Sequence, residues 1–143
     1  MDEIANLKSL AKAAGGQIFH QDSPGEKSVK NALDRLGINY IQEVMVNLNK
    51  YDPEIYWSRF DFYVPAYKAV IEFDGKQHRQ YDKKYHKTMW HYVHQKKRDK
   101  AEKACCEAVK VKLIRIQYSA LRSGFTNNLR NALNDECSYC ELR

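Results

Sequence analysis

RFDFYVPAYKAVIEFDGKQH, residues 59–78, contains two short runs of aromatic and β-branched residues separated by Pro65 and Ala66. Such runs are typical of β-strands. We therefore expect strands over residues 59–64 and 68–74 that are joined by a turn and pair with each other. The rest of the fold is expected to form around this hairpin.

Asp61, Glu72 and Asp74 place three carboxyl groups on the hairpin. Because successive side chains of a strand point to opposite faces, Glu72 and Asp74 share one face, and Asp61 is expected to face away from its two phenylalanine neighbours. Like charges this close raise one another's pKa and repel, so a cation is expected beside them. A hard divalent ion held through one or two carboxylates, water and substrate phosphate fits this requirement.

Two further residues extend the pattern. Gly75 allows the backbone to approach a ligand closely, and His78 can reach back toward the carboxylates. An isolated acidic residue on a strand is usually an ordinary solvent-facing position, and this is the alternative for Asp61 alone. The five residues together favour a functional site, because carboxylates with perturbed pKa values cluster at such sites.

The bulk properties indicate a single domain over residues 1–143. The hydrophobic fraction of 43% is enough for a core. No apolar run approaches the roughly 18 residues that span a bilayer. The first residues, MDEIANLKSLAKAAGG, lack the apolar centre of a signal peptide. We therefore expect an intracellular protein that is not secreted and is not bound to a membrane.

Positive charge is concentrated in one segment. The chain carries a formal charge of +6, and residues 76–100 alone hold nine Lys or Arg against two acidic residues. A localised basic segment is typical of contact with a phosphate backbone, although a solvated helix face is the alternative. The candidate DNA-contacting residues are Lys76, Arg79, Lys83, Lys84, Lys87, Lys96, Lys97 and Arg98. Tyr81, Tyr85, Trp90 and Tyr92 lie among them and suit base or sugar stacking.

Four cysteines occur, at positions 105, 106, 137 and 140. We expect them to be reduced, as in a cytosolic protein. The Cys-x-x-Cys at 137–140 could form half of a zinc site, but the sequence has no second pair with matching spacing. A structural zinc ion is therefore not expected.

Helices are expected on both sides of the hairpin. The first spans residues 2–14 and belongs to an N-terminal extension of residues 1–20. The second begins with Ser23 as N-cap and Pro24 at its first position, and ends at Gly37. Glu26 has two interpretations that the sequence leaves equal: a capping box with Ser23, or a place at the edge of the carboxylate patch.

The remaining elements complete an α/β fold. A strand is expected over residues 40–46 before the hairpin, followed by a polar loop. The basic segment is followed by a helix that buries Ala101, Ala104, Cys105 and Ala108, and then by a strand over residues 109–116. The last region, residues 119–143, is expected to be a helix that begins at Ser119 and a tail. The order α-α-β-β-β-α-β-α predicts a small mixed β-sheet flanked by helices.

These motifs resemble the PD-(D/E)XK nuclease superfamily. The likeness is strongest to the branch similar to the very-short-patch mismatch endonuclease, which includes EDxHD homing endonucleases and small nucleases with an E-x-D-G-x-x-H signature. It covers about residues 20–120, and the hairpin, with VIEFDGKQH at 70–78, is its specific part. The resemblance implies a restriction-endonuclease-like core.

The resemblance also implies roles for particular residues. The positions that match the family's site are Asp61, Glu72, Asp74, His78, Glu26 and Asp99. The first three are expected to bind or support Mg²⁺, or Mn²⁺ in its place. His78 is expected near the attacking water or the scissile phosphate, and the last two match helix acids.

The chain departs from the family pattern in two ways. The superfamily's lysine, two residues after Glu72, is Asp74 here, and Lys76, Lys96 or Lys103 could supply a cation instead. The mismatch endonuclease holds zinc just after the glycine, where this chain has Lys76 and Gln77. That zinc site therefore does not carry over.

The function expected from these features is a Mg²⁺-dependent endonuclease that hydrolyses double-stranded DNA. The alternatives are a DNA-binding module without catalysis on the same fold and a nuclease specific for DNA junctions. One active site per chain makes one nick, so cutting both strands would require two chains to pair.

Overall fold

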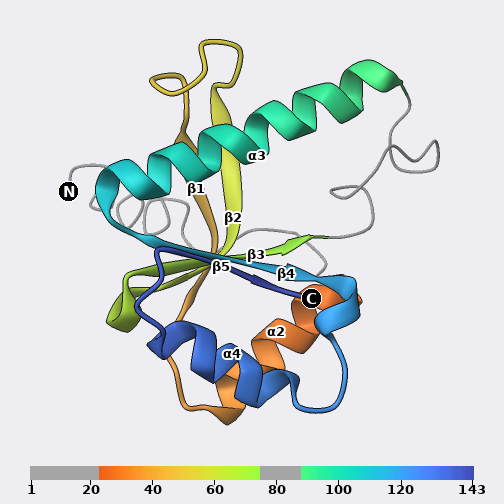
Figure 1. Ribbon diagram of the computed structural model, residues 1–143, viewed down its shortest axis with the longest axis vertical. Coiled ribbons are helices and arrows are strands. Elements are labelled where there is room, and N and C mark those ends of the chain that lie inside the picture. Colours follow the sequence, from red (N-terminus) through yellow and green to blue (C-terminus); the bar gives the residue numbers. More distant parts are fainter. Residues whose placement is uncertain (1–22, 75–87) are drawn as a thin grey trace.

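The computed structural model describes residues 23–74 and 88–143 (Figure 1). Several predictions concern residues outside these ranges: the N-terminal helix, Gly75, His78, and the candidate DNA-contacting residues Lys76, Arg79, Lys83, Lys84 and Lys87.

A five-stranded sheet with the order β1-β2-β3-β4-β5 forms the centre of the molecule. Its strands are β1 Ile41–Asn47, β2 Trp57–Val64, β3 Ala69–Asp74, β4 Lys112–Gln117 and β5 Tyr139–Leu142. The first three are antiparallel, and β4 and β5 continue the sheet in parallel. Helix α3 (Met89–Val109) crosses one face, and α2 (Pro24–Arg35) and α4 (Phe125–Asn134) cover the other (Figure 1). This confirms the expected α/β class, a small mixed sheet with helices on both faces.

The predicted hairpin is present as β2 and β3. Pro65 starts a single 3-10 turn, Pro65–Tyr67, where the missing amide of proline leaves no ladder bond unmade. Lys68 follows in the left-handed region at φ 48°, and this reverses the chain into β3. The two strands pair over only three positions, from Val64 with Ala69 to Phe62 with Ile71. On the N-terminal side of Phe62, the strand β2 therefore pairs with β1 alone.

Helix α2 begins and ends where the sequence predicts. The Ser23 hydroxyl accepts a hydrogen bond from the Glu26 amide at 3.2 Å. At the other end Gly37 has φ 68°, and its amide donates to the Asp34 carbonyl at 3.1 Å. A left-handed residue at this position satisfies a carbonyl that the helix leaves open.

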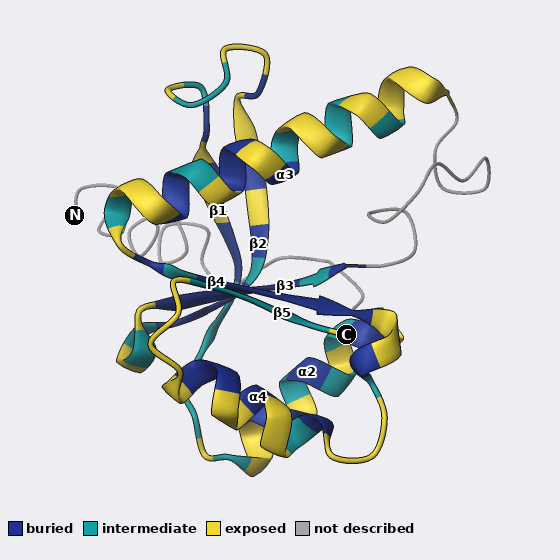
Figure 2. Ribbon diagram, viewed as in Figure 1, coloured by how far each residue is buried: buried dark blue, intermediate teal, exposed yellow. Residues whose placement is uncertain are grey.

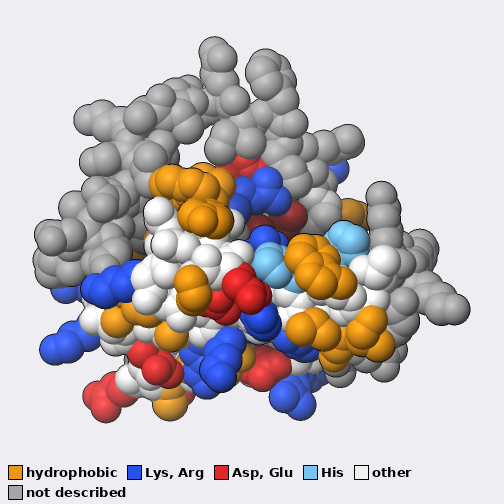
Figure 3. Space-filling model, turned by 90° about the horizontal axis from the view of Figure 1, so that it is seen from above, with side chains coloured by type: hydrophobic (Ala, Val, Ile, Leu, Met, Phe, Trp, Pro, Cys, Tyr) orange, Lys and Arg blue, Asp and Glu red, His pale blue; other side chains and the backbone are white. Residues whose placement is uncertain are grey.

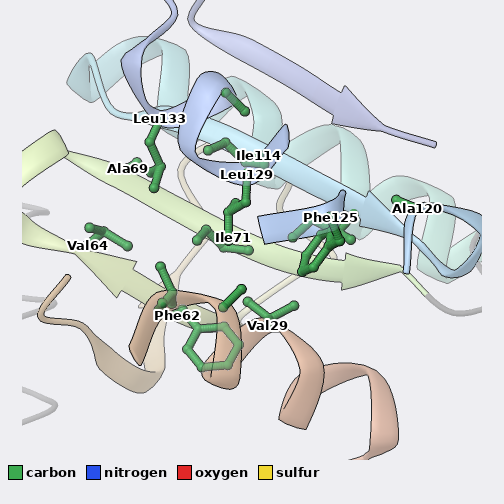
Figure 4. Close-up of a cluster of buried hydrophobic side chains, with 14 residues drawn as sticks. Val29, Phe62, Val64, Ala69, Ile71, Ile114, Ala120, Phe125, Leu129 and Leu133 are labelled. Carbon is green, nitrogen blue, oxygen red and sulfur yellow. The ribbon is translucent and has the colours of Figure 1, made fainter. Parts of the chain in front are cut away.

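Two hydrophobic cores lie on the two faces of the sheet (Figure 2). The core under α3 includes Phe60, Tyr63, Val70, Leu113, Cys105 and Cys106. The core under α2 and α4, drawn in Figure 4, includes Val29, Phe62, Ile71, Ile114, Leu129 and Leu133. Each fully buried large aliphatic or aromatic side chain contributes about 1.5–3 kcal/mol, so these cores hold the helices against the sheet.

The alternation predicted around Asp61 is wrong. Phe60 packs in the core under α3 and Phe62 in the core on the opposite face, so the two phenylalanines do not share a face. Opposite Asp61 in the register, Glu43 adopts φ 56°, which is uncommon for a residue other than glycine. At this departure from extended geometry the regular alternation of side chains along β1 and β2 is interrupted. Phe60 and Phe62 therefore point to opposite faces of the sheet.

Helix α3 is longer than predicted. It begins at Met89, capped by the Thr88 hydroxyl, so Trp90 and Tyr92 lie on the helix and not before it. Its buried face also differs: Ala108 is exposed, whereas Glu102 is buried. Lys110 ends the helix at φ 59°, and the following strand begins at Lys112 instead of residue 109.

The C-terminal region contains a strand that the sequence analysis missed. Residues 139–142 pair in parallel with β4 as β5, where a tail was expected. Helix α4 begins at Phe125 after Gly124 at φ 90°, and not at Ser119, which lies in the 3-10 turn Tyr118–Ala120. None of the helices described here has both the length and the apolarity to cross a membrane.

Candidate active site

A cavity of about 440 Å³ opens where β2 and β3 separate. Four of the six residues that match the family's site line it: Glu26 from α2, Asp61 from β2, Glu72 from β3 and Asp99 from α3. The other lining residues are Met45, Trp57, Ser58, Arg59, Phe73, Gln95, Arg98 and Glu102. Seen from the face that carries α3, acidic side chains lie between basic and hydrophobic ones (Figure 3). The fold therefore brings together acids that are 73 positions apart in the sequence, from 26 to 99.

Asp61 is held by the strand next to it. Its Oδ2 accepts a hydrogen bond from the Phe73 amide at 2.7 Å. The last β2–β3 ladder pair is Phe62 with Ile71, and Asp61 is the next residue of β2 toward its N-terminus. The Phe73 amide of β3 therefore donates to a side-chain carboxylate and not to a backbone carbonyl of β2. The contact fixes Asp61 beside Glu72, the residue before Phe73.

Glu72 is a buried acid of the cavity with a strongly raised pKa. Its residue is 7% exposed, and its Oε1 has no hydrogen-bond partner among the described residues. Burial raises its pKa well above the usual value, and the nearby charges of Glu102, Asp61 and Asp74 raise it further. Arg115 lowers it, but by less. A buried acceptor without a donor is costly, and such atoms point to a ligand or an ion.

Arg115 partly neutralises the acidic side chains of this region. It is the register partner of Glu72 on β4. Its guanidinium lies 3.3 Å from the Glu102 carboxylate and 3.8 Å from that of Asp99, and donates to the Asp99 carbonyl at 2.8 Å. Burial lowers the pKa of Arg115, but the charges of Asp99 and Glu102 outweigh this, so the pKa is raised overall. Asp99 is therefore an ion-pair partner as well as a lining residue.

Glu102 is the site residue that sequence reasoning missed. It is 2% exposed and accepts a hydrogen bond from the Ser58 hydroxyl at 2.6 Å. Its signal was its spacing: three residues after Asp99 on a helix, it must lie on the same face. The buried face predicted for this helix consists of its small residues alone, and no role was predicted for Glu102.

Glu26 lines the cavity, as the second of its two interpretations expects. Of the capping box, the structure shows the bond from the Glu26 amide to the Ser23 hydroxyl. The helix reaches the cavity because Gly25 lies against the Phe73 ring, so closely that a Cβ at this position would overlap the ring. The absence of a side chain at Gly25 thus sets the distance between α2 and β3.

Replacing Gly25 by alanine should destabilise the protein by about 1–3 kcal/mol, because the added methyl group overpacks the contact with Phe73. Urea unfolding measures the change. Glycine-to-alanine substitutions within helices otherwise stabilise by about 1 kcal/mol, so an unchanged or raised stability would show that α2 and β3 are not in close contact.

Asp74 does not line the cavity of Asp61 and Glu72. It lines a second cavity of about 370 Å³ with Lys96, Arg115, Gln117 and Glu141, and Asp99 borders both cavities. Its charge still contributes to the raised pKa of Glu72. The prediction that Asp74 shares one patch with Asp61 and Glu72 therefore holds electrostatically but not as a shared cavity.

The described basic residues separate into different environments. Lys97 forms an ion pair with Glu54 of the β1–β2 loop at 2.6 Å. Lys96 lies over the Tyr92 ring at 5.6 Å, and Lys103 over the Tyr139 ring at 4.4 Å. Among the candidates from the basic segment that the structure describes, Arg98 lines the cavity with Glu72.

The donor set fits a hard divalent cation. Within residues 23–74 and 88–143, no group of three His, Cys or acidic side chains is arranged to hold a metal. Mg²⁺ does not need one, because it usually binds through one or two carboxylates and keeps several waters. The buried Glu72 oxygen without a donor, beside the positioned Asp61, supplies such a pair.

None of the four cysteines lines this cavity. Cys105 and Cys106 are buried in the core under α3, and burial raises the pKa of the Cys106 thiol. Cys137 is exposed and Cys140 half-buried at the start of β5, and all four are free thiols.

Comparison with known proteins gives no family: no family model and no curated sequence matches this chain.

Proposed function

We propose that this chain is a divalent-metal-dependent endonuclease that hydrolyses phosphodiester bonds in DNA. The observation that carries the proposal is the buried Glu72 carboxylate, with one oxygen lacking a donor, in a cavity lined by Glu26, Asp61 and Asp99. Acidic groups gathered at low exposure beside a basic segment suit a metal and a phosphate backbone together.

We also propose that the fold is restriction-endonuclease-like. In support, the sheet runs β1-β2-β3 antiparallel, crosses over through α3 and adds β4 in parallel. The acids lie where β2 and β3 separate, with a helix on each side. This is the arrangement that the resemblance implies, and fold alone would not assign a function.

The residues that would hold the metal are Asp61 and Glu72, with Asp74 in support. A bound divalent ion lowers the pKa of water and neutralises charge that develops on phosphate. In hydrolysis a water oxygen forms a new bond to phosphorus and the ester oxygen leaves with its bonding pair. Overall one proton passes from the water to that leaving oxygen. The cavity walls orient the phosphate, and the Asp61–Phe73 hydrogen bond fixes the carboxylate that faces it.

The second candidate function is DNA binding without cleavage. It is favoured by the separation of Asp74 into another cavity and by the presence of Asp74 where the superfamily has its lysine. In that reading the carboxylates would be structural and the basic segment would bind DNA.

Incubation with plasmid and short duplex DNA separates the two. We expect nicked or linear products with Mg²⁺ or Mn²⁺ and none with EDTA, and we expect Asp61→Asn to cut at least about a hundredfold more slowly. A panel of linear, mismatched and branched duplexes would identify the substrate. DNA that is shifted on a gel but stays uncut in all metals would favour the binding module.

A further inference from the structure

Two arginines, Arg59 and Arg98, line the cavity of Glu72. Arg59 lies 3.7 Å from the Glu43 carboxylate. Arg115 of β4, whose side chain is 10% exposed, contacts Asp99 and Glu102 of the cavity wall. Arg98 forms no ion pair with any carboxylate of the described residues. Arg59 and Arg115 therefore balance acids of the folded protein, and Arg98 does not.

The Arg98 side chain is half-buried, and its Nε is enclosed without a hydrogen-bond partner among the residues described. Burying a donor without an acceptor is unfavourable. Glu26, Asp61 and Glu72 line the same cavity, yet none of their carboxylates is within ion-pair distance of the Arg98 guanidinium. The guanidinium is thus held near the acids and away from contact with them.

The neighbours of Arg98 on α3 point to different partners, because successive helix residues are turned by about 100°. Lys97 reaches Glu54 in the β1–β2 loop, and Lys96 lies at the Asp74 cavity. Arg98 is the residue of this basic run that the helix directs to the cavity of Glu72.

We infer that Arg98 is a catalytic residue whose guanidinium contacts the scissile phosphate, an inference that rests on the proposed endonuclease function. A planar guanidinium can donate two parallel hydrogen bonds to the non-bridging oxygens of a phosphate. Those oxygens carry the charge that grows as the new bond to phosphorus forms, and a fixed donor placed there stabilises the transition state. A phosphate between Arg98 and the acid-bound cation would also give the enclosed guanidinium its missing acceptor.

The role predicts a loss in kcat without a matching loss in binding. Arg98→Gln should lower kcat by about 10²–10³-fold, the effect of losing one transition-state donor. KM, and the Kd for duplex DNA measured in EDTA, should change by less than about threefold. Arg98→Lys should retain part of the rate, because it keeps the charge but loses the bidentate geometry. Added guanidinium ion should restore activity to Arg98→Ala more than sodium at equal ionic strength does.

Arg35→Gln is the matched control. Arg35 is exposed in the last turn of α2, at the opposite end of that helix from Glu26, and lines a different cavity. It should cut at the wild-type rate and melt at the wild-type temperature.

The outcomes are separable. If the wild-type chain cuts no DNA with any divalent metal, the endonuclease proposal is wrong, and so is the catalytic role of Arg98. If the wild type cuts and Arg98→Gln cuts at the rate of Arg35→Gln, only the assignment of Arg98 fails. A change confined to Kd and KM would likewise overturn it, since Arg98 would then be an ordinary backbone contact.

Discussion

Replacing Glu72 by glutamine should abolish DNA cleavage and, at the same time, stabilise the metal-free protein. Glutamine has nearly the same shape but no negative charge, so it is a poor ligand for a hard cation, and we expect a loss of at least about 10²–10³-fold in rate. The stabilisation has a separate cause. Glu72 is 7% exposed among other acids, and its Oε1 lacks a donor within the described residues.

The stability effect should depend on pH in one direction. Because the pKa of Glu72 is raised in the folded state, the unfolded chain loses this proton first as the pH rises. The stability associated with the protonated group is complete below the ordinary value of 4.5 and is lost as the pH rises through the raised folded value. The advantage of Glu72→Gln over wild type should therefore be small in acid and grow toward neutral pH.

Urea unfolding in EDTA across this pH range measures the advantage, and a cleavage assay measures the loss of rate. Glu107→Gln supplies the matched control, because Glu107 is exposed on α3. It should change neither quantity. A variant at position 72 that cut DNA at the wild-type rate would remove Glu72 from the active site. A variant less stable than wild type at neutral pH would mean that its charge is compensated in the fold.

Replacing Arg115 by methionine should be the most destabilising single change at the site. Its removal leaves Glu102, at 2% exposure, and Asp99 without the guanidinium that both contact. Breaking a buried ion pair by removing one partner costs about 3–5 kcal/mol. Metal-free unfolding by urea should show this loss, and the variant should be more strongly destabilised at neutral than at acid pH.

A second substitution tests the reason for that loss. Glu102→Gln removes one of the two charges and can still accept the Ser58 hydroxyl. Added to Arg115→Met, it should recover part of the lost stability, so the two changes should not be additive. Strict additivity would show that Arg115 stabilises the fold through packing of its side chain and not through Glu102.

The sequence was sufficient where local chemistry decides the structure. The Pro65 break, the Ser23 cap and the Gly37 stop each act within a few residues, and all three are confirmed. The acids Glu26, Asp61, Glu72 and Asp99 were identified and do share one cavity.

It was insufficient where contacts between distant segments decide. Phe60 and Phe62, on either side of Asp61, point to opposite faces of the sheet, next to the left-handed Glu43 of the neighbouring strand. The pattern of residues within β2 does not show this conformation of β1. Glu102 is buried because Arg115 of another element neutralises it. Strand β5 is only four residues long and half-buried throughout, so neither its length nor its pattern separates it from a tail.

The order of the strands also bears on how the protein folds. The β1-β2-β3 meander joins neighbours in sequence and can form early, whereas β4 must wait for the closure of the long crossover through α3. We therefore expect Asp61 and Glu72 to come together before Arg115 of β4, whose charge lowers the pKa of Glu72. On this order, cations in the medium that screen the two carboxylates should accelerate folding.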